Sequence, residues 1–113
     1  MIEIQNPKQY DLKKRTYEFA KKVREFVKKL PRTISNIEDG KQVIRSSGSI
    51  GANYIEANEA LSKKEAKETM HWLRMVAKAN AEQSDICRKL YREVHELTLI
   101  FSTIVRNSKQ GKQ

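Results

Sequence analysis

Apolar residues recur at three- and four-residue steps along most of the chain, which is the spacing that places side chains on one face of a helix. This pattern predicts four helices and no strands, over residues 7–30, 36–60, 63–78 and 84–107. For the first helix, Asn6 fits the N-cap, Pro7 fits the first helical position and Pro31 fits the end. We therefore expect an all-α fold in which residues 1–113 form a single helical-bundle domain.

The start of the third helix is set by a short local motif. Ser62-Lys-Lys-Glu65 matches a capping box, so the helix is expected to begin at Lys63. It would then be about 16 residues long, against about 24 for each of the others. One alternative is a single long helix over residues 36–78, because no strong helix breaker separates the two segments.

The second predicted helix is unusual in its content of small residues. Between its apolar positions it carries Ser46, Ser47, Gly48, Ser49, Gly51 and Ala52. Each glycine weakens a helix by about 1 kcal/mol relative to alanine, so we expect a close approach of another backbone here. Close helix packing is favoured over phosphate docking, because no glycine-rich loop ending in Lys-Ser or Lys-Thr follows a strand.

The length of the chain, its cysteine count and its apolar segments restrict the class of protein. A chain of 113 residues is long enough for one modest core. The single cysteine, Cys87, excludes an intramolecular disulfide and is expected to be a buried apolar side chain in a reducing compartment. No segment approaches the ~20 apolar residues of a membrane span, and the first residues lack the order of a signal peptide. We expect a cytoplasmic protein that does not bind membranes.

Positive charge is concentrated near the beginning of the chain. The net charge is +9, and residues 8–32 hold ten basic residues against three acidic ones. Basic residues recur every seven positions along the first helix, which predicts two adjacent positive ridges. Glu18 and Glu25 also fit a solvated helix whose charges pair with one another. The candidate phosphate contacts are Lys14, Arg15, Lys21, Lys22, Lys28, Lys29 and Arg32.

Several motifs resemble those of a known family. The central one is Arg45-Ser-x-x-Ser49-Ile50-x-x-Asn53-x-x-Glu56, flanked by Arg15-Thr-x-x-Phe19-Ala20 and by Glu65-Ala-Lys-Glu68-Thr. The chain resembles the bacterial four-helix bundle proteins encoded by intervening sequences within large-subunit ribosomal RNA genes. Accessory variability proteins of diversity-generating retroelements are relatives of that family.

The resemblance implies an up-down antiparallel four-helix bundle that assembles into a ring-like homopentamer. In the retroelement branch it also implies a basic surface that binds RNA and a reverse transcriptase. One difference lies at the third helix, where the family has an acidic residue and a large aromatic before the Lys-Glu-Ala-Lys-Glu stretch. Here Lys64 leads directly into Glu65, so about three helical turns are missing. Either the third helix is shortened or part of it is absent from this sequence.

The signature also contains polar residues that need partners if the second helix is buried. Besides Ser49, the signature contains Arg45, Asn53 and Glu56, and these three are the ones in question. Burying such groups without hydrogen bonds would cost several kcal/mol, so they are expected to bond across helices or to lie between subunits. We expect Arg45 to pair with Glu65 or Glu68 on the third helix.

No pattern of catalytic residues is found. Glu68-x-x-His71 has the spacing used by di-iron bundle proteins, but Arg92 stands where a second such motif would need a carboxylate before His95. The chain has no Cys-x-x-Cys, no His-Glu-x-x-His and no nucleophile with a base beside it. The sequence predicts neither enzymatic activity, nor a metal, nor a cofactor.

The sequence therefore favours a non-enzymatic, oligomeric accessory protein that binds nucleic acid through its basic first helix. Structured RNA is favoured over DNA, and phosphate contacts and shape would dominate, because no base-reading motif is present. The alternative is a protein–protein scaffold without a nucleic-acid role. In that case the charge serves solubility alone, and Tyr54, Trp72 and the small-residue face form interfaces.

Overall fold

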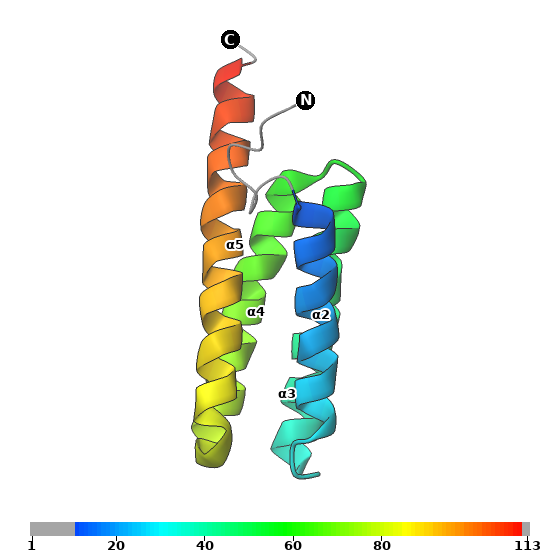
Figure 1. Cartoon of the computed structure of the whole chain (residues 1–113), viewed down its shortest axis with the longest axis vertical. Helices are drawn as coiled ribbons and strands as arrows, with labels where there is room; N and C mark the ends of the chain where they lie inside the picture. Colours follow the sequence, from blue (N-terminus) through cyan, green and yellow to red (C-terminus); the bar gives the residue numbers. More distant parts are fainter. Residues whose placement is uncertain (1–10, 112–113) are drawn as a thin grey trace.

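The computed structural model describes residues 11–111, with side chains up to Ser108. Four long helices occupy this part of the chain, with a short 3-10 turn, η1 (Ala81–Gln83), between the last two. They are α2 (Leu12–Lys28), α3 (Ile34–Ile55), α4 (Glu59–Ala79) and α5 (Ser84–Gly111). Successive helices run in opposite directions (Figure 1). The predicted all-α, up-down four-helix bundle is confirmed.

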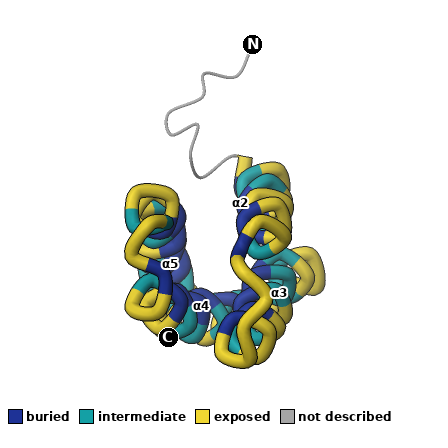
Figure 2. The backbone as a smooth tube through the Cα atoms, turned by 90° about the horizontal axis from the view of Figure 1, so that it is seen from below, coloured by how far each residue is buried: buried dark blue, intermediate teal, exposed yellow. Residues whose placement is uncertain are grey.

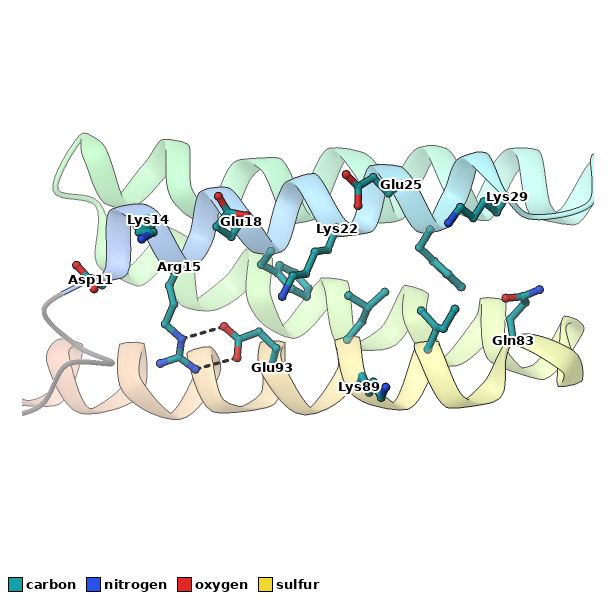
Figure 3. Close-up of a pocket in the computed structure, with 14 residues that line it drawn as sticks. Asp11, Lys14, Arg15, Glu18, Lys22, Glu25, Lys29, Gln83, Lys89 and Glu93 are labelled. Carbon is teal, nitrogen blue, oxygen red and sulfur yellow. Dashed lines mark hydrogen bonds and ion pairs between the residues drawn. The ribbon is translucent and has the colours of Figure 1, made fainter.

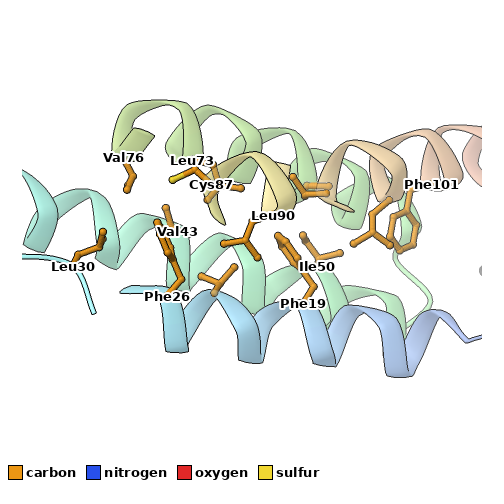
Figure 4. Packing of buried hydrophobic residues seen from close by; sticks show 14 of the residues in the cluster. Phe19, Phe26, Leu30, Val43, Ile50, Leu73, Val76, Cys87, Leu90 and Phe101 are labelled. Carbon is orange, nitrogen blue, oxygen red and sulfur yellow. The ribbon is translucent and has the colours of Figure 1, made fainter. Parts of the chain in front are cut away.

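The core is made of the apolar stripes that the sequence predicted. Phe19, Val43, Leu73 and Phe101, one from each helix, are each no more than 2% exposed. Their side chains lie between the helices in Figure 4. Burial of a side chain of this size contributes about 1.5–3 kcal/mol, so the four stripes together hold the helices in place.

The four helices are not packed equally. Seen along the bundle axis, α3 and α4 form the base of a U, while α2 and α5 form its two arms (Figure 2). The buried positions line the inside of the U. As a result, α2 packs mainly against α3, and the side between α2 and α5 is open.

The junction of α3 and α4 differs from both sequence expectations. The chain leaves the helix at Glu56, Ala57 has a positive φ of 59°, and Asn58 caps α4 by accepting a hydrogen bond from the Leu61 amide at 3.3 Å. The Asn58 and Ala57 amides donate to the carbonyls of Asn53 and Tyr54 at 2.8 and 3.0 Å, which is a Schellman motif. The continuous helix over 36–78 is therefore wrong.

The predicted capping box is also wrong, and so is the short third helix. Ser62 lies inside α4, fully buried, and its hydroxyl donates to the Ile50 carbonyl at 2.8 Å. Since Asn58 supplies the cap instead, α4 has 21 residues and almost matches the 22 of α3. The third of the four described helices is therefore not shortened relative to α3.

The outer helix ends shift by a few residues. The first helix begins at Leu12, and the predicted cap Asn6 and first residue Pro7 lie outside the described residues. The last helix continues past 107 to Gly111, so the polar tail extends it further than expected. In Figure 1 this end of α5 runs beyond the other three helices.

The small residues of α3 serve the packing of α2. A Cβ added at Gly51 would lie 2.7 Å from the Thr16 hydroxyl oxygen, and one added at Gly40 would lie 2.9 Å from a methyl group of Val27. Real Cβ contacts are not this short, so α2 can approach α3 only because these positions are glycine. At Gly51 the close approach predicted for this segment is confirmed.

Candidate nucleic-acid interface

The basic residues of α2 fall on two sides of that helix. Lys14, Arg15, Lys22 and Lys29 line a groove between α2 and α5 (Figure 3), which we call the α2–α5 groove. Lys21 and Lys28 line a second groove on the opposite side, between α2 and α3, which we call the α2–α3 groove. Arg32 lies beyond the end of α2, in a hollow that it shares with Lys28 and Lys41.

This division follows from helix geometry. An ideal α-helix drifts by about 20° for every seven residues. The ridge of Lys14, Lys21 and Lys28 therefore crosses the outer face of α2, from the α5 side at Lys14 to the α3 side at Lys28. The first predicted ridge is therefore divided between the two grooves, whereas the second, Arg15, Lys22 and Lys29, lines the α2–α5 groove alone.

The α2–α5 groove, about 710 Å³ in volume, has an apolar floor and a rim of mixed charge. Phe19, Phe26 and Leu90 form its floor and are each less than 7% exposed. Along the rim, the carboxylates of Glu18 and Glu25 alternate with the lysines of α2. Because charges of both signs line this groove, its net potential is weak.

One end of the α2–α5 groove is spanned by an ion-pair cluster. The Arg15 guanidinium donates two hydrogen bonds to Glu93 of α5, at 2.8 and 2.9 Å, and also donates to Glu96. The hydrogen bond to Glu93 is the main cause that raises the pKa of Arg15 above its ordinary value. The side chain of Arg15 is only 15% exposed. Arg15 therefore connects the two arms of the U.

The α2–α3 groove, about 550 Å³ in volume, is more uniformly basic. It contains two cations that the seven-residue periodicity missed, Lys13 and Arg24, beside Lys21 and Lys28. Its floor includes Gly48, Gly51 and Ala52 of α3. The four cations lie on one ridge with Tyr17, at steps of three and four residues. That spacing could have revealed the ridge in the sequence.

In the part of the chain that the structure describes, the exposed cations of α2 have no carboxylate partners. Within residues 11–111, no nitrogen of the lysines of α2, of Arg24 or of Arg32 lies within 4.0 Å of a carboxylate oxygen; Arg15 is the exception. Glu18 and Glu25 likewise form no ion pair in this part of the chain. The arrangement expected of a solvated helix with self-paired charges is therefore not what the structure has.

The predicted partner of Arg45 is confirmed. Arg45 donates to Glu65 at 3.3 Å and to Glu68 at 2.9 Å, so it bridges α3 to both acidic residues of α4. The hydrogen bond to Glu68 is the main cause that raises the pKa of Arg45. Because Arg45 is half-exposed, this cluster is a surface contact between helices.

The other signature residues act within or at the end of α3. Ser49 donates its hydroxyl hydrogen to the Arg45 carbonyl at 2.9 Å, and Asn53 donates to the Ser49 carbonyl at 2.8 Å. Glu56 is the exposed C-cap residue. Within residues 11–111 the helix itself satisfies Asn53 and water reaches Glu56, so bonding across helices is wrong for these two residues. Their alternative position between subunits stays a prediction.

The remaining reactive side chains contact ordinary neighbours. His71 packs edge-on against Trp72, with ring centroids 4.7 Å apart, and Glu68 is bonded to Arg45. Cys87 is 3% exposed, as expected for a buried apolar side chain, and this burial raises the pKa of its thiol. Over residues 11–111 there is no group of three or more His, Cys, Asp or Glu that could hold a metal ion.

Comparison of the chain with family models, curated proteins and solved structures finds no match. Among the described helices, none is both long enough and apolar enough to cross a membrane.

Proposed function

We propose that this protein is a non-enzymatic accessory protein that binds nucleic acid through the basic surface of α2, with structured RNA preferred over DNA. The proposed phosphate contacts are Lys14, Lys21, Lys22, Lys28, Lys29 and Arg32. Arg15 is left out of this set, because Glu93 and Glu96 hold its guanidinium.

The observation that carries the proposal is the row of exposed cations without carboxylate partners. Each of the six side chains is exposed, and none has an acidic partner within residues 11–111. Such charges repel one another, and phosphate groups relieve that repulsion by replacing condensed counterions. A surface of this kind favours a polyanionic partner.

Oligomerisation, proposed from the family resemblance, would strengthen a modest site. A ring of identical subunits repeats the basic surface, and linked weak contacts bind far more tightly than one alone. A homopentamer in the cytoplasm is the form we propose. Mass measurement by analytical ultracentrifugation across micromolar concentrations tests this part independently of RNA.

A charge-swap variant tests the binding surface. Lys21, Lys22, Lys28 and Lys29 are changed to Glu, and binding to a labelled RNA hairpin is measured across a salt series. The natural protein should show a logarithm of affinity that falls linearly with the logarithm of salt, because counterions are released. The variant should lose this binding.

A matched control separates local from overall charge. Changing Lys64, Lys67, Arg74 and Lys78 to Glu gives the same net charge, but all four cations lie on α4, away from both α2 grooves. This control should retain most of the affinity, while circular dichroism verifies that both variants are folded. Unchanged RNA binding in the α2 variant would refute the proposal.

The scaffold alternative is favoured by one observation, the apolar floor of the open α2–α5 groove. Of the residues expected to form its interfaces, Tyr54 and Trp72 are partly buried against the core. Tyr54 packs edge-on against Phe101 at 5.7 Å, and the glycines of α3 contact α2. If RNA does not bind even at low salt, this groove becomes the surface on which to seek a protein partner.

A further inference from the structure

The α2–α3 groove contains a large aromatic side chain in an unusual setting. Tyr17 is 66% exposed, and within residues 11–111 its ring packs against no other aromatic ring and its hydroxyl has no hydrogen-bond partner. It lies four residues from Lys13 and four from Lys21, on the same ridge of α2. The ring of Tyr17 offers a flat face for stacking, and the neighbouring lysines supply positive charge on either side of it.

The groove also has a clear excess of positive charge. Four cations, Lys13, Lys21, Arg24 and Lys28, line it against one carboxylate, that of Glu25. In the α2–α5 groove, by contrast, five cations face four carboxylates. A phosphate backbone would therefore be attracted to the α3 side of α2 more strongly than to the α5 side.

Gly48 leaves room for one of these cations. Arg24 donates to the Ala20 carbonyl at 3.2 Å, and one of its terminal nitrogens lies 3.3 Å from where a Cβ of Gly48 would be. The glycine leaves the space into which the guanidinium extends, so this group lies low in the groove. A planar guanidinium in that position can donate two parallel hydrogen bonds to a phosphate.

We infer that the α2–α3 groove binds an unpaired stretch of RNA, with phosphates against Lys13, Lys21, Arg24 and Lys28 and a base stacked on Tyr17. This inference rests on the proposed function and specifies which part of a structured RNA is bound. Bases within a duplex are stacked on one another and cannot cover a tyrosine ring, whereas bases in loops, bulges and ends can. Basic grooves with exposed aromatic rings bind single strands in this way.

The aromatic ring is tested with two variants of one residue. Tyr17→Ala removes the ring, while Tyr17→Phe keeps it and removes only the hydroxyl. The probe is a labelled oligouridine of about 12 nucleotides, within the usual range of site sizes, compared with an RNA duplex of equal length. Tyr17→Ala should weaken oligouridine binding about tenfold and leave duplex binding nearly unchanged, and Tyr17→Phe should bind both like the natural protein.

The cations are tested by the salt dependence of oligouridine binding. Changing Lys21 and Lys28 to Gln should reduce the slope of log affinity against log salt by about 1.4, or about 0.7 for each phosphate that the variant no longer neutralises. A control that changes Lys64 and Lys67 of α4 to Gln should keep the slope.

The outcomes separate this inference from the proposed function. If the fourfold α2 charge swap abolishes RNA binding but Tyr17→Ala has no effect, the proposed function stands and the stacking groove is refuted. If no RNA binds the natural protein, both fail. If Tyr17→Ala lowers the mass of the oligomer and leaves oligouridine binding intact, the groove is a subunit contact and the inference is overturned.

Discussion

The side chains of Asn36 and Asn80 exchange two hydrogen bonds at the end of the bundle where α2 joins α3. Asn36 donates to Asn80 at 2.9 Å, and Asn80 donates to Asn36 at 2.7 Å. The second donor hydrogen of each amide binds a backbone carbonyl, that of Pro31 for Asn36 and that of Val76 for Asn80. Both residues are buried. The pair thus ties the α2–α3 connection to the end of α4.

Replacing either asparagine should destabilise the protein. In Asn80→Ala the carboxamide of Asn36 stays buried without its partner. The unfolding free energy, measured by urea denaturation, should therefore fall by about 1–3 kcal/mol. The double variant with Asn36→Ala should lose less than the sum of the two single losses, because the residues act as one unit. Asn107→Ala, on an exposed turn of α5, should change stability by less than about 0.5 kcal/mol. Additive losses would show that the two amides are not coupled.

Two glycines of α3 should respond oppositely to alanine. At Gly51 the new methyl group would meet the Thr16 hydroxyl, which is fixed by a 2.7 Å hydrogen bond to the Leu12 carbonyl. Gly51→Ala should therefore cost about 1–3 kcal/mol. At Gly48 the neighbour is the far end of the long, exposed Arg24 side chain, which can turn aside, so Gly48→Ala should be neutral or gain up to about 1 kcal/mol from better helix propensity. Thermal unfolding of both variants tests this, and equal effects would contradict the close approach at Gly51.

The turn between α3 and α4 should be improved by glycine. Ala57 has a φ of 59°, a left-handed conformation that costs an ordinary residue about 1–2 kcal/mol and glycine very little. Ala57→Gly should raise the unfolding free energy by about 1 kcal/mol, measured by urea denaturation. Ala52→Gly, inside α3, should lower it by a similar amount. A loss of stability in Ala57→Gly would argue against the Schellman turn.

The features that the sequence predicted correctly are those that depend on local periodicity. The apolar stripes predict four helices because the buried face of an amphipathic helix can be recognised from apolar residues spaced three and four positions apart. The pairing of Arg45 with Glu65 or Glu68 was likewise predicted, because all three residues belong to the motifs that carry the family resemblance.

Other features were missed because they depend on tertiary geometry. Alanine at position 57 does not signal a helix end, and Ser62 reads as a cap although it is fully buried against the Ile50 carbonyl. For the candidate interface, residue spacing showed that α2 is basic. Residue spacing could not show that α3 and α5 lie on either side of α2. This packing creates the two grooves between which the cations are divided.

The ion-pair cluster of Arg15 should stabilise the bundle more than an exposed ion pair does. Arg15 is mostly buried and joins α2 to Glu93 and Glu96 of α5, across the open side of the U. Because both carboxylates are about one third exposed, solvent screens part of the interaction. Arg15→Met, which keeps most of the apolar stem, should lower the unfolding free energy by about 1–2 kcal/mol.

A matched variant provides the control for Arg15. Arg88 forms an exposed ion pair with Asp85 on α5, so Arg88→Met should cost less than about 0.5 kcal/mol. Hydrogen exchange should locate the effect of Arg15→Met, because α2 packs mainly on α3 and would be without its main polar link to α5. Amides near the start of α2 should exchange faster, while those in the middle of α4 stay protected. Equal losses in the two variants, or unchanged exchange in α2, would mean that the apolar stripe alone holds α2 in place.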